Sequence, residues 1–226
     1  NICHLHKHYG EGTGIYWIWK NIIKNMNAND WIGTCHYRRF WLNNLYNNKQ
    51  KLSMSSLYSN LLKLDNKIFS RCDAIQVQPT TFKNETIFQQ FNKVHGQNIL
   101  DACTNFLEIN ERDTFTEFLY GNNLSHTIFI TKVHLFEKYC ESLFPWLKKC
   151  YEYCIKNDLC KGNNSRLPAF LMERYATYWL KKNIKNKEYL SYARVGNLMR
   201  SNNLNKFINP MKIPFTFRMY PTLHRY

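Results

Sequence analysis

A dense group of polar side chains, His36, Tyr37, Arg38 and Arg39, follows a short apolar run in the segment Trp31–Trp41. Guanidinium groups present planar, paired donors that suit phosphate or carboxylate oxygens, and they stay charged at any working pH. The imidazole of His36 and the phenol of Tyr37 could orient the same ligand. The four residues therefore predict a site for an anionic ligand.

The residues before this group predict the strand that would carry it. Trp31 to Cys35 has high β propensity and is too short for a helix. In open α/β sheets the ligand crevice lies beyond the carboxyl ends of the strands, which is where the polar group would stand. Because strand side chains alternate, Arg38 and Arg39 could instead point to opposite faces, one bridging a surface carboxylate and the other solvated.

A helix is predicted from Thr13, which is a plausible N-cap. Its apolar residues recur at helical spacing: Ile15, Ile18, Trp19, Ile22, Ile23 and Met26. Trp17 and Lys20 fall off this stripe. They could stack on a base or a sugar ring, or they could belong to a second packing face against a neighbouring helix.

Two carboxylates elsewhere in the chain are candidates for the same chemistry. Asp73 lies inside a strand predicted over 68–77, where it could hold a sugar hydroxyl or cap the next turn. Glu173 lies near the start of a helix opened by Pro168, where the helix dipole favours a carboxylate. Glu173 could equally be a positioned base.

The remaining pattern predicts a helix over 82–118, a strand over 127–131, a helix over 135–155 kinked or restarted by Pro145, and an extended tail over 204–226. His95 lies on the apolar face of the first of these helices, where a hydrogen-bonded core histidine is commoner than a base. A content of 44% hydrophobic residues in 226 suffices for a core. We therefore expect one α/β domain over 1–226.

The charge is strongly positive, with 31 Lys and Arg against 16 Asp and Glu. The expected partners are therefore, in the first place, polyanions, nucleotide phosphates and acidic membrane surfaces. No stretch has the order of a signal peptide, and no apolar run approaches the length of a membrane span. Eight cysteines are too few for a disulfide scaffold, which favours a reducing compartment. We expect a cytoplasmic protein, with peripheral membrane contact left open.

Two groups of residues could be metal ligands, but the sequence favours neither as a metal site. His4, His6 and His8 alternate along one side, but only Cys3 stands nearby to complete a set. The thiols Cys150, Cys154 and Cys160 lack a fourth ligand at zinc-finger spacing. No cofactor is predicted, and a divalent metal such as Mn²⁺ stays open.

Three blocks together resemble a family of proteins regarded as glycosyltransferases, found in capsule and lipopolysaccharide gene sets and long labelled a domain of unknown function. The blocks are Glu11 and Thr13 with Tyr16–Asn21 (YWIWKN), Ile32–Phe40 (IGTCHYRRF), and Arg166 followed by Phe170–Arg174 (FLMER). Members normally carry an N-terminal strand region before the tryptophan helix. We therefore expect an N-terminally incomplete member, and whether its first strands are missing stays open.

The resemblance implies a nucleotide-sugar-binding fold of the GT-A type, with a small central sheet flanked by helices. It also implies a nucleotide-sugar donor and a glycan or lipid-linked acceptor. Such enzymes commonly hold a divalent metal with Asp-x-Asp, which this chain lacks. Arg38 and Arg39 would then neutralise the departing diphosphate, and Glu173 would be the general base. Together with Asp73, which is a candidate from its place at a strand end, the predicted substrate-binding residues are His36, Tyr37, Arg38, Arg39, Glu11, Trp17, Lys20, Arg166 and Arg174.

Two alternatives come from other classes. The charge and a content of 16% aromatic residues could suit a nucleic-acid-binding module. The basic residues are scattered rather than gathered in a stripe, so we expect no specific nucleic-acid partner. A catalytically inactive, partner-binding homologue is the other alternative.

Overall fold

The computed structural model describes residues 2–35, 39–43, 54–63 and 66–194. Their packing divides the chain into two compact units. The first unit comprises Asn1–Asp30, Pro79–Thr127 and Lys132–Lys185, and the second comprises Trp31–Gln78, Ile128–Thr131 and Asn186–Tyr226. The single domain expected over 1–226 stays a prediction, and the tail over 204–226 lies outside the described residues.

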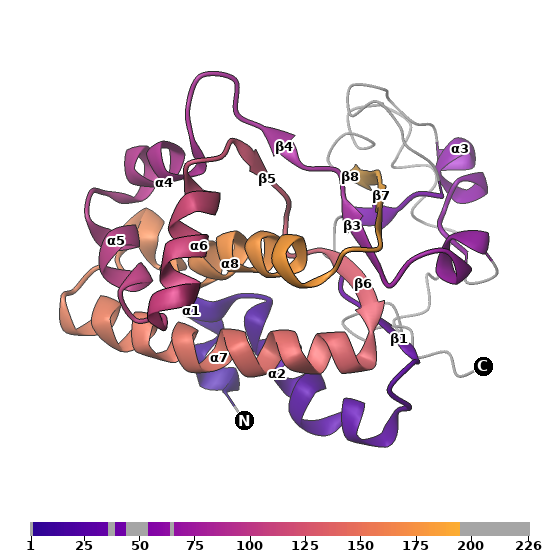
Figure 1. The fold of residues 1–226 in the computed structure, drawn as a ribbon, viewed down its shortest axis with the longest axis horizontal. Helices are drawn as coiled ribbons and strands as arrows, with labels where there is room; N and C mark the ends of the chain where they lie inside the picture. The colour runs from indigo at the N-terminus through magenta and orange to yellow at the C-terminus, as the bar shows by residue number, and fades with distance from the viewer. Residues whose placement is uncertain (1, 36–38, 44–53, 64–65, 195–226) are drawn as a thin grey trace, which may run out of the picture. The chain divides into compact units, whose positions relative to one another are not determined.

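The first unit is mainly helical (Figure 1). Its α-helices are α1 (His6–Tyr9), α2 (Gly12–Asn21), α4 (Ile87–His95), α5 (Ile99–Thr104), α6 (Ile109–Leu119), α7 (Val133–Lys156) and α8 (Leu167–Asn183). Short 3-10 turns are η1 (Cys3–Leu5), η2 (Ile23–Asn25) and η4 (Gly162–Asn164), and β4 (Thr80–Thr81) pairs with β5 (Asn123–Leu124). The long helix α7 lies along α8, and these two helices form the centre of the unit.

Aromatic side chains fill the space between α6, α7 and α8. Trp146 of α7 stacks on Tyr175 of α8 with ring centroids 4.8 Å apart, and Phe115 of α6 meets both rings edge-on at 5.8 Å. The Tyr175 hydroxyl donates to Glu111 of α6 at 2.7 Å. Burial, together with this carboxylate, raises the pKa of Tyr175 far above its usual value. The core therefore holds its phenol neutral.

The second unit contains a four-stranded sheet in the order β1 (Trp31–Gly33), β6 (Phe129–Lys132), β3 (Ala74–Val77) and β7 (Lys187–Leu190). Strand β3 pairs antiparallel with β6 and parallel with β7. A second, two-stranded sheet pairs β2 (Arg39–Trp41) with β8 (Tyr192–Arg194) in antiparallel register. The helix α3 (Met54–Ser59) and the 3-10 turn η3 (Lys67–Ser70) also belong to the unit.

Close packing in this sheet explains a glycine in its first strand. All four residues of β3 are buried, and Ile75 belongs to a core cluster with Ile68 and Leu190. A Cβ on Gly33 would stand 2.8 Å from Ile130 Cγ1 of β6. Only glycine therefore fits here without displacing the Ile130 side chain. The expected α/β class, with helices and a small central mixed sheet, is confirmed.

Several predicted boundaries are wrong for local reasons. The helix predicted over 82–118 is three helices, and the first two are separated by Gly96 and Asn98, which adopt positive φ angles of 108° and 65°. The strand predicted over 68–77 begins only at Ala74, because the Asn66 side chain caps η3 by accepting from the Ile68 amide.

Two further expectations concern helices, of which the N-cap at Thr13 is wrong and the kink at Pro145 stays a prediction. Thr13 is not the N-cap of its helix but lies in the first turn of α2, where its hydroxyl donates to the Gly10 carbonyl. Helix α7 runs through Pro145 as one helix rather than restarting there. Among the described helices, none combines the length and apolar character that crossing a bilayer requires.

Candidate functional site

Glu173 is held on both sides of its carboxylate. It lies in the second turn of α8, with its side chain about one quarter exposed. Its Oε1 is 2.7 Å from His126 Nδ1, and its Oε2 accepts from the Arg174 guanidinium at 3.0 Å. Because a carboxylate can only accept, the His126 Nδ1 carries the proton of this bond. The carboxylate is thus oriented and still reached by solvent.

Arg174, by contrast, is buried, with a side chain 4% exposed. Its guanidinium donates to the Phe170 carbonyl, to Glu173 and, at 2.6 Å, to the Gln90 side chain of α4. Burial lowers the pKa of Arg174, and the neighbouring Glu173 charge acts in the opposite direction. Glu173 is therefore the counter-ion that keeps a buried cation stable.

A second Glu–Arg pair lies at the start of the same helix. Glu11 Oε2 accepts from the Arg166 guanidinium at 2.9 Å, and its Oε1 accepts from the Thr127 hydroxyl at 3.1 Å. Gly10 has a φ of +51°, and a Cβ there would stand 2.2 Å from Arg166 Nη2. Glycine is thus required by the backbone conformation, and a Cβ at this position would also displace the flexible end of the Arg166 side chain.

The two carboxylates are joined through consecutive residues of one segment. His126 bonds to Glu173, and the next residue, Thr127, bonds to Glu11. This segment is tied to α8 by Thr177, whose hydroxyl donates to the Ser125 carbonyl at 2.9 Å. Four predicted site residues, Glu11, Arg166, Glu173 and Arg174, are therefore connected to one polar segment of the first unit, which we call the carboxylate cluster.

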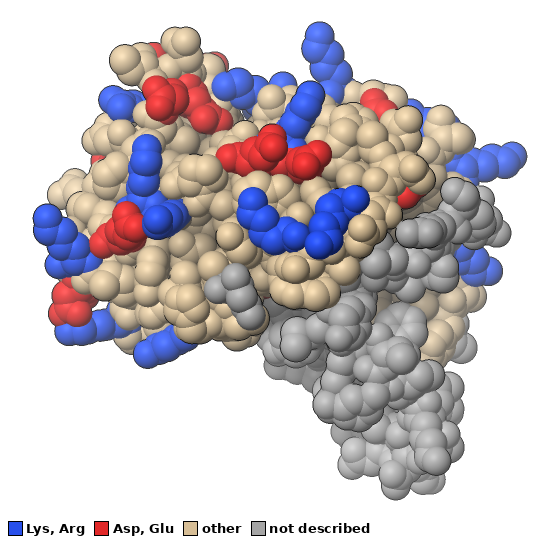
Figure 2. All heavy atoms as spheres, turned by 90° about the horizontal axis from the view of Figure 1, so that it is seen from below, with Lys and Arg blue, Asp and Glu red and all other residues tan. Residues whose placement is uncertain are grey.

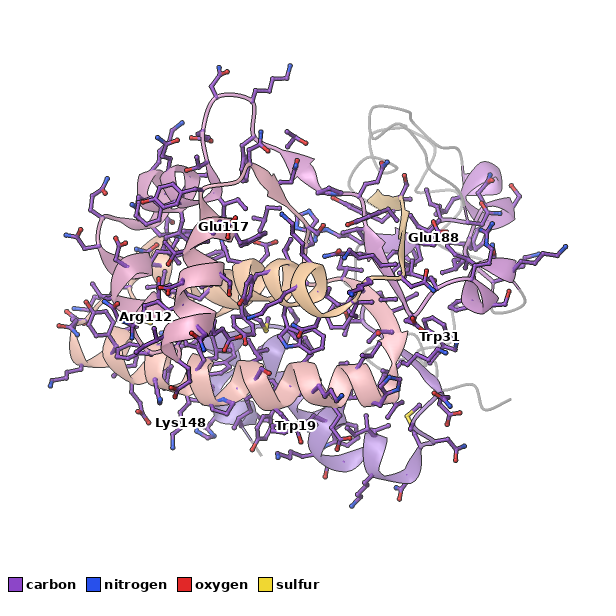
Figure 3. The ribbon with its side chains drawn as sticks, viewed as in Figure 1. Trp19, Trp31, Arg112, Glu117, Lys148 and Glu188 are labelled. Atoms are coloured by element: carbon purple, nitrogen blue, oxygen red, sulfur yellow. The ribbon has the colours of Figure 1, made fainter. Side chains whose placement is uncertain are left out.

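The helix α2 presents the other two candidates of the first unit. Trp19, labelled in Figure 3, stacks on Phe144 of α7 with centroids 5.5 Å apart. Lys20 Nζ lies 3.3 Å from the centroid of the Trp19 ring. This lysine therefore contacts the residue through which α2 packs on α7. Trp17 is 37% exposed. The roles of Trp17 and Lys20 in ligand binding stay predictions.

His95 is a core histidine, as expected. It is 7% exposed, lies against Phe170 and Phe91, and its Nδ1 is 3.0 Å from the Asn164 side chain. Burial lowers its pKa, which favours the neutral ring. His95 therefore supports the start of α8 and is not a candidate base.

The candidates of the second unit are Arg39 and Asp73. The Arg39 guanidinium lies over the Tyr192 ring at 5.2 Å, and none of the acidic side chains in the described part of the chain forms an ion pair with it. Asp73 directly precedes β3, where its amide donates to the Asn186 carbonyl. His36, Tyr37 and Arg38 lie outside the described residues, so the site built on them stays a prediction.

His126, Thr127 and Gln90 were not predicted as site residues. Their signal was weak, because short groups of polar residues beside an apolar run are common. The polar triplet Ser125-His126-Thr127, at the start of the strand predicted over 127–131, was the one available indication.

The residues do not match the usual metal sites. The sequence has no Asp-x-Asp. Within the described ranges, no group of three or more His, Cys, Asp or Glu side chains is arranged to hold a metal ion. All eight cysteines are free thiols.

A family model described as a domain of unknown function, DUF4422, matches residues 1–187. The chain belongs to the DUF4422 family. This match supports the resemblance at the level of the family, and it covers all three blocks that carry it. No curated protein matches the chain.

The fold of this DUF4422 chain is similar to that of a solved enzyme, the bifunctional glycosyltransferase WbbM in its apo structure. The TM-score is 0.65 at 16% sequence identity, and the similarity covers 86% of this chain and 38% of that one. The chain thus spans well under half the length of that enzyme. At this identity the likeness concerns the fold alone.

Proposed function

We propose that this chain is a glycosyltransferase domain of the hexosyltransferase type. It moves a sugar from a nucleotide-sugar donor to a glycan or lipid-linked acceptor in surface polysaccharide synthesis. The observation that supports this most is the fold likeness to a bifunctional glycosyltransferase over 86% of the chain. Membership of DUF4422 and the carboxylate cluster are consistent with it.

On the acceptor side, Glu173 takes the proton of the attacking hydroxyl. The acceptor O–H bond breaks as the new bond to the sugar carbon forms, and the electron pair of the old bond leaves with the nucleoside diphosphate. His126 and Arg174 fix the two carboxylate oxygens, so Glu173 needs no reorganisation. Glu11 and Arg166, about half exposed, bind sugar hydroxyls.

On the donor side, the developing diphosphate charge is neutralised by Arg39 and its neighbour Arg38. Arg39 forms no ion pair among the described side chains, so its charge is available to a ligand. Paired guanidinium donors can supply the electrostatic stabilisation that a divalent cation supplies elsewhere. His36 and Tyr37 orient the donor, Asp73 holds a sugar hydroxyl, and Trp17 and Lys20 contact its rings.

Donor binding is tested by a thermal-shift screen of uridine, guanosine and thymidine diphosphate sugars in buffer containing EDTA. Because ligand binding to the folded state raises its stability, at least one donor should raise the melting temperature without added metal. Screening the same compounds with Mn²⁺ is the control. If stabilisation requires Mn²⁺, the arginine-based neutralisation is wrong, and if no donor stabilises the chain in either buffer, the proposed function is wrong.

A further inference from the structure

A groove in the first unit is lined by residues that the proposed function does not use. Its volume is about 360 Å³ and it is open to solvent. The lining includes Phe82, Asn84, Glu85, Gln89, Tyr120 and Asn122. These residues come from the loop before α4, from α4 itself and from the turn after α6.

The walls of the groove are fixed by main-chain hydrogen bonds. The Phe82 amide donates to the Asn122 carbonyl, and the Ile87 amide donates to the Gly121 carbonyl, both at 2.8 Å. Thr86 and Gln89 form a reciprocal capping box at the start of α4, with bonds of 2.9 and 3.1 Å. The groove is therefore pre-formed, and a ligand would pay little ordering entropy of the protein.

Tyr120 provides an aromatic surface at the groove. Its side chain is 63% exposed, although it carries a large ring. The ring packs on Phe88 with centroids 5.8 Å apart and an interplanar angle of 28°. One side of the ring is thus supported by protein while most of the residue stays in water. An electron-rich aromatic face attracts the polarised C–H groups on the apolar face of a pyranose ring.

The polar lining favours a neutral, hydroxyl-rich ligand. The amide side chains of Asn84 and Asn122 offer both donors and acceptors, which is what vicinal sugar hydroxyls require, and Gln89, whose oxygen accepts from the Thr86 amide, adds its NH₂ donors. The charged residues of the lining, Lys83 and Glu85, have opposite signs, so the groove has no excess charge for a phosphate. Glu85 is also engaged by Lys93 at 3.4 Å.

We propose that this groove is a glycan-binding site in which one pyranose ring stacks on Tyr120 and the amides bind its hydroxyls. It would hold a segment of an oligosaccharide chain. It deepens the proposed function by naming the acceptor as an extended glycan, and to that extent rests on it. Binding itself requires neither a nucleotide sugar nor sugar transfer.

The test is saturation-transfer NMR and titration calorimetry on the full chain with tetrasaccharides of glucose, galactose and mannose as probes, without nucleotide sugar. We expect at least one probe to bind. Tyr120→Ala should weaken that binding by about tenfold or more, because the stacking surface is lost. Tyr120→Phe should bind within about twofold of the natural chain, because it keeps the ring.

Ile109→Ser is the matched control, since Ile109 is an equally exposed apolar residue of the same unit, at 68%. It should leave binding unchanged. The proposal is overturned if no probe binds, or if Tyr120→Ala binds as well as Ile109→Ser does. Because the assay measures no transfer, its failure is distinguishable from failure of the proposed function.

Discussion

At the scale of single residues, two Glu–Arg pairs of similar geometry differ in how far water reaches them. The Arg174 side chain is 4% exposed, whereas Arg166 and Glu11 are 47% and 39% exposed. Removing one partner of a buried pair leaves an uncompensated charge, while an exposed pair contributes little. Loss of the partner of Arg174 should therefore lower the stability of the fold more than loss of the partner of Arg166, although both arginines belong to the carboxylate cluster.

This difference predicts unequal effects of the matched substitutions Glu173→Ala and Glu11→Ala. Glu173→Ala should lower the free energy of unfolding by about 3 kcal/mol, because Arg174 loses its counter-ion. Glu11→Ala should lower it by less than about 1 kcal/mol. Urea unfolding of both variants measures the two values. Equal losses would contradict the assignment of Glu173 as the counter-ion of a buried cation.

Residue types predicted part of the cluster, but not its connections. Glu11, Arg166, Glu173 and Arg174 were singled out because their blocks resemble a family pattern. His126 and Thr127 stand far from those blocks in sequence, and only folding brings them to the carboxylates. Glu111 shows the same limit, since its place in a predicted helix did not indicate that it accepts from the phenol of Tyr175.

At the scale of elements, the turn between α1 and α2 joins the N-terminal block to the start of α8. Gly10 makes this possible, because its positive φ and missing Cβ leave room for the Arg166 guanidinium. Gly14 is different. It lies within α2, and a Cβ there would meet nothing within 4 Å.

The two glycines therefore predict opposite outcomes. Gly10→Ala should lower the free energy of unfolding by about 1–3 kcal/mol, through backbone strain and displacement of Arg166. Gly14→Ala should raise it by about 0.5–1 kcal/mol, because alanine is the better residue inside a helix. Thermal unfolding of the two variants is the measurement. A neutral Gly10→Ala would show that the turn does not depend on glycine.

Helices and strands were predicted well where the hydrophobic periodicity of the sequence continued without interruption. They were predicted poorly where a helix cap interrupted that periodicity. The apolar stripe of α7 extends over the whole helix, and its bounds lie within two residues of the expected 135–155. The helix predicted over 82–118 failed at Gly96 and Asn98, because their left-handed backbone stops one helix and starts the next. A side-chain cap such as that of Asn66 affects a single turn, so the hydrophobic periodicity of the sequence hardly indicates it.

At the scale of the whole molecule, positive charge is divided unequally between the two units. The second unit has 14 of the 31 Lys and Arg but only three of the 16 Asp and Glu. On the face drawn in Figure 2, by contrast, residues of both signs are interspersed. This asymmetry favours the second unit as the binder of an anionic ligand, consistent with the proposed role of Arg39.

Arg39→Ala should accordingly weaken the binding of uridine diphosphate by about tenfold, the loss of one charge-assisted contact. Arg71→Ala is the control, because Arg71 is an exposed arginine of the same unit. Calorimetric titration at low and moderate salt should also show weaker binding at the higher ionic strength. If both variants bind uridine diphosphate alike, Arg39 is not a phosphate ligand.

The central claim is that Glu173 of the carboxylate cluster takes a proton during sugar transfer. The most direct test is the rate at which the natural chain and Glu173→Gln release nucleoside diphosphate from the donor found by thermal shift, with Glu11→Gln for comparison. Glutamine keeps the shape and can still accept from Arg174 but lacks the counter-charge, so folding of Glu173→Gln is checked first by its unfolding transition, and the folded variant should lose at least about a hundredfold in rate. A folded Glu173→Gln variant that turns over the donor as fast as the natural chain would contradict the account.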